Sequence, residues 1–172
     1  MGGTAAIIDR TALRNNLNII RRTIPPNTRV MGVVKANCYG HGTELCVPVL
    51  CDEGIDLFGV ANVAEGHALR QSGIEGAIVV LGPPLPETMA AYGQNRLEAF
   101  VSNHRMAAQL AEATPIGASV NVHLFLDTGM ARNGAHPTDA VELLRYMAAI
   151  PELNIVGFAS HFATSDEPEN PF

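Results

Sequence analysis

The regular alternation of short apolar runs with helical patterns constrains the fold of this chain more than any other feature. Six runs have the length and composition of strands, at residues 29–35, 57–61, 77–81, 97–101, 120–126 and 155–160. Amphipathic stretches lie between them, at 43–53, 63–72, 86–93, 104–113 and 138–149, and another helical stretch precedes the first run at 11–22. A strand and a helix that repeat roughly every 20–35 residues are typical of a parallel sheet.

The predicted strands are nearly continuous in apolar character, which indicates a sheet that is covered on both faces. Two architectures have this property, the open doubly wound sheet and the (β/α)8 barrel. The first strand is not followed by the Gly-x-Gly-x-x-Gly turn of a dinucleotide-binding open sheet. We therefore expect an α/β fold of the parallel (β/α)8 TIM type.

The length of the chain predicts an incomplete barrel. Eight βα units take about 250 residues, whereas this chain has 172 residues and about six units. An open barrel leaves two unpaired sheet edges, which proteins normally avoid. We expect residues 1–172 to form one truncated barrel domain, either a fragment of a longer protein or a unit that a partner completes.

Composition excludes several classes of function. The net charge is -6 and the basic residues are scattered, so nucleic-acid binding is not expected. There is no apolar run long enough to span a membrane and no signal peptide at the N-terminus, so a cytoplasmic location is expected. Three cysteines without the spacing of zinc ligands predict no metal site.

Lys35 is the only lysine in a chain with ten arginines. A lysine can lose its proton, act as a nucleophile and form an imine, none of which an arginine does in proteins. Two ordinary explanations stay open at this point. The genome can favour arginine codons, and a lysine at the end of a strand can simply extend its amine into solvent.

Polar residues gather where three of the predicted strands end. The first cluster runs from Lys35 to His41, the second from Asp127 to Gly134, and the third from Ser160 to Asp166. In a parallel α/β fold the functional site lies at the carboxyl ends of the strands. Each cluster alone has a structural explanation: an exposed lysine, a loop with a helix cap, and a hydrogen-bonded core histidine at 161. Together the three predict a site.

Three motifs resemble the N-terminal barrel of bacterial alanine racemase. They read Val-Lys-Ala-Asn-x-Tyr-Gly-His-Gly, Leu-Asp-Thr-Gly-Met-x-Arg-x-Gly and Ser-His-Phe-Ala-x-x-Asp, and the resemblance extends in order over nearly all of the chain. It implies an enzyme that uses pyridoxal 5'-phosphate (PLP) to interconvert L- and D-alanine and supplies D-alanine for peptidoglycan. It also implies a small amino-acid substrate and a homodimer.

The resemblance also implies a role for each matching residue. Lys35 would bind PLP covalently and serve as the catalytic base for the Cα proton on the D side of the substrate. Tyr39 would hydrogen-bond the PLP phosphate. Arg132 would lie near the PLP phenolic oxygen and the substrate carboxylate, and Met130 near the substrate. His161 would orient other groups around the cofactor.

This chain departs from the family at two positions. Cys38 stands where the family usually has alanine, and Phe125 where it often has a lysine that braces the arginine of the second motif. The last barrel strands are missing, as is the C-terminal β domain that provides the opposite base, a tyrosine that reaches the partner's site. Tyr92 and Tyr146 lie in helical patterns and are poor substitutes, so this chain alone is expected to be inactive.

Three alternatives remain. The parent enzyme could racemise serine or a basic amino acid on the same fold, because the missing regions help to set the substrate. The chain could instead belong to a non-catalytic PLP-binding carrier or regulator, although such barrels generally lack the Asp-Thr-Gly-Met-x-Arg motif. The third alternative is an inert barrel fragment that binds no cofactor.

Overall fold

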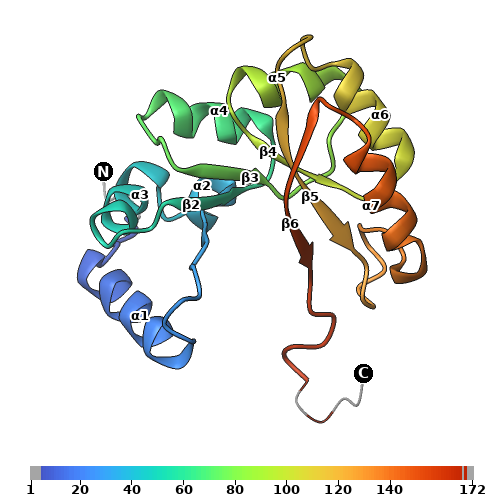
Figure 1. The fold of residues 1–172 in the computed structure, drawn as a ribbon. Helices are drawn as coiled ribbons and strands as arrows, with labels where there is room; N and C mark the ends of the chain where they lie inside the picture. Colours follow the sequence, from blue (N-terminus) through green and yellow to red (C-terminus); the bar gives the residue numbers. More distant parts are fainter. Residues whose placement is uncertain (1–4, 168, 170–172) are drawn as a thin grey trace. The chain divides into compact units, whose positions relative to one another are not determined.

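The computed structural model describes residues 5–167 and 169 (Figure 1). The chain divides into two compact units, Met1–Val79 and Val80–Phe172. Both are built from a strand followed by a helix, and in both the strands are parallel and follow one another in chain order. This is the repeat of the (β/α)8 barrel, and six of its strands are present, as the sequence predicts.

The described residues of the first unit form four helices and three strands. They are α1 (Arg10–Thr23), β1 (Gly32–Val33), α2 (Lys35–Tyr39), α3 (Thr43–Asp52), β2 (Leu57–Val60), α4 (Val63–Gln71) and β3 (Ala77–Val80). Asp9 caps α1 by accepting hydrogen bonds from the N–H groups of Thr11 and Ala12, at 2.8 and 3.1 Å. The helix ends at Thr23 because Ile24 precedes a proline and is extended.

Charged residues join α1 to the end of α3. Arg14 lies 3.3 Å from carboxylate oxygens of both Asp52 and Glu53, and Arg21 lies 3.7 Å from Glu53. In the sheet, Gly32 of β1 stands opposite Phe58 of β2. Phe58 on β2 and Ile78 on β3 belong to the fully buried apolar core. β1, which leads to the polar cluster at Lys35, is held by its pairing with β2.

In the second unit, three strands, three α-helices and two short 3-10 helices lie within the part of the chain that the structure describes. They are η1 (Pro86–Thr88), α5 (Met89–Gln94), β4 (Glu98–Val101), α6 (His104–Glu112), β5 (Val120–Leu126), η2 (Pro137–Asp139), α7 (Ala140–Ala148) and β6 (Leu153–Ser160). β5 pairs with β4 and with β6, and its pairing with β6 shifts register between Val122 and His123. Leu110, Leu124 and Met147 are fully buried in its core.

The amino-terminal part of one face of this second sheet is polar, which the apolar pattern of the strands did not predict. His123 on β5 and Glu98 on β4 meet at 2.7 Å, and Asn121 donates a hydrogen bond to Glu98 at 3.1 Å. Asn154 of β6 donates to Asn121 at 2.8 Å. A chain of partnered polar side chains therefore crosses the three strands at their amino-terminal halves.

The predicted elements are confirmed, but several of their limits are wrong. The first strand was predicted to run to Lys35, whereas β1 ends at Val33 and Lys35 begins a separate turn. The stretches 86–93 and 138–149 each open with a 3-10 turn that starts at a proline. The helical stretch predicted to end at residue 93 continues to Gln94, and Arg96 beyond it takes the left-handed conformation.

Among the described residues, no helix is both long enough and apolar enough to cross a membrane.

Candidate functional site

Lys35 begins a left-handed turn. Ala36, Asn37, Cys38 and Tyr39 have φ angles of 50°, 54°, 54° and 54°, although none of them is glycine. A side chain in this conformation crowds the following carbonyl and costs roughly 1–2 kcal/mol per residue. Four such residues in succession persist only where surrounding interactions hold them, so the segment after Lys35 is a strained feature at the predicted site.

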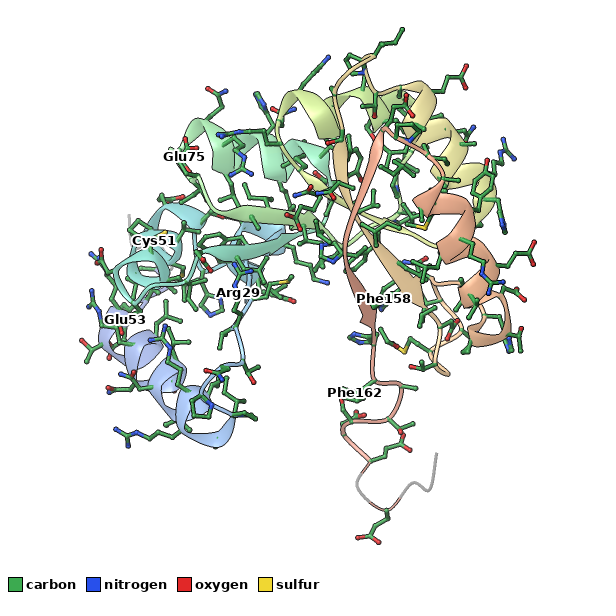
Figure 2. The ribbon with its side chains drawn as sticks, in the orientation of Figure 1. Arg29, Cys51, Glu53, Glu75, Phe158 and Phe162 are labelled. Atoms are coloured by element: carbon green, nitrogen blue, oxygen red, sulfur yellow. The ribbon has the colours of Figure 1, made fainter. Side chains whose placement is uncertain are left out.

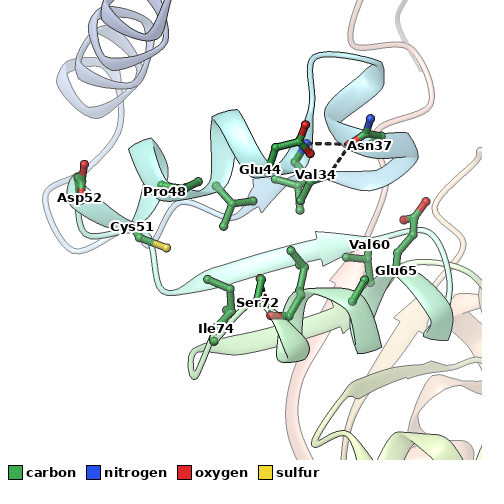
Figure 3. Close-up of a pocket in the computed structure, with 15 residues that line it drawn as sticks. Val34, Asn37, Glu44, Pro48, Cys51, Asp52, Val60, Glu65, Ser72 and Ile74 are labelled. Atoms are coloured by element: carbon green, nitrogen blue, oxygen red, sulfur yellow. Dashed lines mark hydrogen bonds between the residues drawn. The ribbon is translucent and has the colours of Figure 1, made fainter.

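Backbone and side-chain hydrogen bonds close this turn at both ends. The Cys38 N–H donates to the carbonyl of Val34 at 3.0 Å, and the Gly42 N–H donates to the carbonyl of Asn37 at 3.0 Å. The side-chain oxygen of Asn37 accepts from the backbone N–H and the hydroxyl of Thr43, at 2.8 and 3.0 Å. Asn37 therefore ties the turn to the first residue of α3 (Figure 3).

The structure brings Lys35 and Tyr39 together. The Lys35 Nζ atom lies 5.8 Å from the centre of the Tyr39 ring, within the range of a cation–π contact. Lys35 is half-buried, whereas Tyr39 is 61% exposed. The amine thus rests beside a phenol that is accessible to a ligand, which is not the arrangement of a lysine that merely extends into solvent.

Glu65 contacts the same turn and was not predicted as a site residue. One carboxylate oxygen accepts from the N–H of Ala36 at 2.9 Å, and the other accepts from the N–H of Ala61 at 2.7 Å. Glu65 lies in the first turn of α4, which Asn62 caps by accepting from the Glu65 N–H at 3.0 Å. The Asn-x-x-Glu spacing of a capping box was the available signal in the sequence.

The second motif forms a closed loop after β5. Backbone hydrogen bonds join Ala135 to Phe125 at 2.8 Å and Asp127 to Ala135 at 2.9 Å. Asp127 accepts from the N–H groups of Gly129 and Ala131 within its own loop, at 2.9 and 3.0 Å. The alternative of an ordinary loop therefore holds for this segment but without the helix cap, because the Asp127 carboxylate accepts within the loop that carries Met130 and Arg132.

The third motif adjoins this loop. The hydroxyls of Thr128 and Ser160 lie 2.6 Å apart, so the loop after β5 is joined to the end of β6. Met130 is half-buried, and Arg132 and His161 are both exposed. Within the described residues His161 is therefore not a core histidine. Exposed apolar rings also occur here, with Phe158 on β6 at 61% and Phe162 beyond it at 84% exposure (Figure 2).

Asp127→Asn is expected to remove a pH-dependent contribution to the stability of the loop. Its hydrogen bonds from Gly129 and Ala131 hold the Asp127 pKa below the ordinary value of 3.8. A lowered pKa contributes stability that is complete above the ordinary value and is lost as the pH falls through the lowered one. When the pH is lowered from neutral to about 3, the melting temperature should therefore decrease less in D127N than in the unmodified protein. Equal pH dependence in both would contradict this assignment.

The two departures from the family motif are both buried packing positions. Phe125 is 7% exposed and stacks on Phe100, with ring centres 4.7 Å apart and planes 6° from parallel. Cys38 is 8% exposed, and burial raises the pKa of its thiol to about 11. Neither side chain is available as a charged group, so Phe125 does not brace Arg132 as a lysine would.

The predicted site residues thus fall into two groups. Lys35 and Tyr39 lie together in the first unit, and Met130, Arg132 and His161 lie at the ends of β5 and β6 in the second. In the first unit Lys35 and Tyr39 are in contact, and in the second the loop that carries Met130 and Arg132 is joined to the end of β6, next to His161. Their assembly into one site, and their individual roles, stay predictions.

Comparison with known proteins gives one consistent family. The family model described as "Alanine racemase, N-terminal domain" matches residues 8–172. The alanine racemase of Chlorobaculum tepidum is 40% identical over 168 residues, which cover 95% of this chain and 44% of the relative. The serine/alanine racemase of Enterococcus gallinarum is 36% identical over 157 residues, which cover 91% of this chain and 22% of the relative.

Solved structures agree with the sequence relatives. The crystal structure of alanine racemase from Bacillus anthracis with bound L-Ala-P matches with a TM-score of 0.87 and 29% identity, over 94% of this chain and 42% of that one. The prediction of a partial barrel of this family is confirmed. The chain spans less than half the length of the alanine racemases that it matches.

Proposed function

Because this chain belongs to the alanine racemase family, as its N-terminal domain, we propose that the full-length protein interconverts L-alanine and D-alanine. The observation that carries the proposal is the only lysine of the chain, placed at the head of a strained turn with its amine beside Tyr39. Strained backbone is retained mainly where function requires it, and the family match runs through this residue.

The residues present fit PLP as the cofactor. Lys35 provides the amine that can form an imine, and the accessible phenol of Tyr39 is a donor for a phosphate. Arg132, on the loop after β5, provides the planar donor pair that suits an anionic oxygen or a carboxylate. When bound, PLP supplies the conjugated ring that accepts the electron pair of the broken Cα–H bond.

The chain's own contribution is to position and move a proton. In our proposal Lys35 Nζ removes the Cα proton on one face of the substrate, or returns it, and is the base for the D-enantiomer. Its half-buried position beside Tyr39 limits the directions in which the amine can point. Racemisation also needs a base on the opposite face, and that base must come from another residue.

The tyrosines of the helices are unsuited to be that second base. Tyr92 is 1% exposed, and burial raises the pKa of its phenol. Tyr146 packs against His104, with ring centres 4.7 Å apart. We therefore propose that the opposite base lies outside this chain, on the partner subunit of a homodimer, and that these 172 residues alone are inactive.

Arg132→Lys in the full-length protein is expected to raise the KM for alanine by about tenfold to a hundredfold. A lysine keeps the charge but cannot form the bidentate contact that an arginine makes with a carboxylate. Each hydrogen bond that involves a charged group is worth about 1.5–3 kcal/mol. Steady-state kinetics in both directions measure the effect. Arg105→Lys, on α6 outside the three motifs, is the matched control. Equal KM values in R132K and the unmodified protein would show that Arg132 does not bind the substrate carboxylate.

Chiral analysis of alanine after incubation of the full-length protein with PLP tests the proposed reaction, and a panel of D- and L-amino acids tests the substrate. The name of the Enterococcus gallinarum relative makes serine the first alternative to include. A protein that binds PLP but racemises no amino acid would be a carrier or regulator instead. A cytoplasmic location and the supply of D-alanine for peptidoglycan belong to the same proposal.

A further inference from the structure

We propose that Glu65 is a positioning residue that holds the left-handed turn and thereby aims the Lys35 amine. The inference rests on the proposed function, in which Lys35 is a catalytic base. The Glu65 carboxylate accepts one hydrogen bond from Ala36, the residue next to Lys35, at 2.9 Å. It accepts a second from Ala61, the residue that follows β2, at 2.7 Å.

The turn needs this contact because the first N–H groups of any helical turn have no partner within it. Later N–H groups of the turn do have backbone partners, such as Cys38 with Val34 and Gly40 with Ala36. The Ala36 N–H instead donates to Glu65, a side chain of α4. Glu65 is therefore the link between the residue after Lys35 and an element distant in the sequence.

Glutamate is suited to this role because both of its oxygens accept. The two donors, Ala36 and Ala61, belong to the segments that follow β1 and β2, so each oxygen serves a different strand end. A glutamine of the same size has one accepting oxygen, and its NH2 group would face the other N–H. An aspartate is one methylene shorter and cannot reach both positions.

The helix that carries Glu65 is itself fixed. Asn62 caps α4 and accepts from the Glu65 N–H at 3.0 Å. Glu65 is half-buried and lines the groove between α3 and α4, together with Asn37 and Val34 (Figure 3). Its side chain reaches toward the turn rather than into open solvent, as a positioning contact requires.

Loss of the carboxylate should let Ala36 and its neighbours relax toward less crowded backbone angles. The direction of the Lys35 side chain would change with them, because its Cα–Cβ bond turns with the backbone. A displacement of about 1 Å of a catalytic group costs as much as a hundredfold in rate. The expected defect is therefore in turnover rather than in substrate affinity.

The test compares E65A, E65Q and E65D with a matched control, E44Q, all in the full-length protein. Glu44 is also an acidic residue in the first turn of a helix beside the turn, and it lines the same groove, but its side chain is exposed. No hydrogen bond from the Glu44 side chain is seen within the described part of the chain. E44Q thus removes one negative charge without removing a hydrogen bond to the turn.

We expect kcat for alanine to decrease about a hundredfold in E65A, with KM changed less than about threefold. The kcat values of E65Q and E65D should lie between those of E65A and the unmodified protein. E44Q should match the unmodified protein. Two further measurements do not depend on turnover. Hydrogen exchange at the Ala36 amide should become faster, and borohydride trapping of PLP on Lys35, mapped by mass spectrometry, should become slower.

The outcomes separate this inference from the proposed function. Unchanged exchange at Ala36 and unchanged trapping at Lys35 in E65A would overturn the inference, whatever the protein racemises. An equal loss of kcat in E44Q would also overturn it, because the effect would then come from charge alone. So would an E65A protein with a lower melting temperature but an unaltered kcat. If the unmodified protein racemises nothing, the proposed function fails, while exchange and trapping still test what Glu65 does.

Discussion

Replacing Lys35 with alanine in the full-length protein is expected to lower racemase turnover by more than about a thousandfold, because one side chain loses both covalent and acid–base roles. Lys35 is the only lysine between residues 1 and 172, so no neighbouring lysine of this chain replaces it. Turnover is measured from L-alanine and from D-alanine separately, since Lys35 is proposed to serve the D-enantiomer.

Lys35→Arg is the informative companion variant. An arginine keeps the positive charge beside the Tyr39 ring but is not deprotonated in proteins and forms no imine. K35R should therefore fold normally, lose the visible absorption of the bound cofactor and be inactive. Exogenous methylamine should partly restore turnover in K35A, because it supplies the missing amine to the space left behind. Full activity in either variant would overturn the role of Lys35.

Gly134→Ala is expected to lower the free energy of unfolding by about 2–3 kcal/mol. Gly134 has a φ of 122°, a conformation that side chains rarely adopt, and a Cβ placed there would lie 2.5 Å from the backbone nitrogen of Asp127. It would also lie 2.7 Å from the carbonyl carbon of Leu126. The backbone must then move, and the closed loop that carries Arg132 would open.

Gly117→Ala provides the matched control. Gly117 also has a positive φ, 83°, but a Cβ there would meet no atom within 4 Å, so the expected cost is about 1 kcal/mol from conformation alone. Thermal melting compares the two variants, and hydrogen exchange at Asp127 and Ala135 reports on the loop itself. If G134A melts at the same temperature as G117A and the amides of Asp127 and Ala135 still exchange slowly, the loop tolerates a side chain at residue 134.

The apolar pattern predicted the repeated units well, because burial between helices and sheet demands it from each strand. The details that failed are those that depend on distant residues. The first strand was extended to Lys35 since Val33 and Val34 are β-branched, yet the backbone reverses there into a left-handed turn. The polar contact between Glu98 and His123 was also missed, because it joins two strands whose pairing no local pattern reveals.

What the sequence by itself determined is the family and the kind of fold, and it predicts the kind of chemistry. A single lysine, three ordered motifs and a βα period suffice for that, because side-chain chemistry and periodic burial are properties of the residues themselves. What only the tertiary structure decided is how the lysine is held. Hydrogen bonds from Ala36 and Ala61 converge on Glu65 only once two strands lie side by side, and a left-handed turn is stable only when such contacts offset its strain.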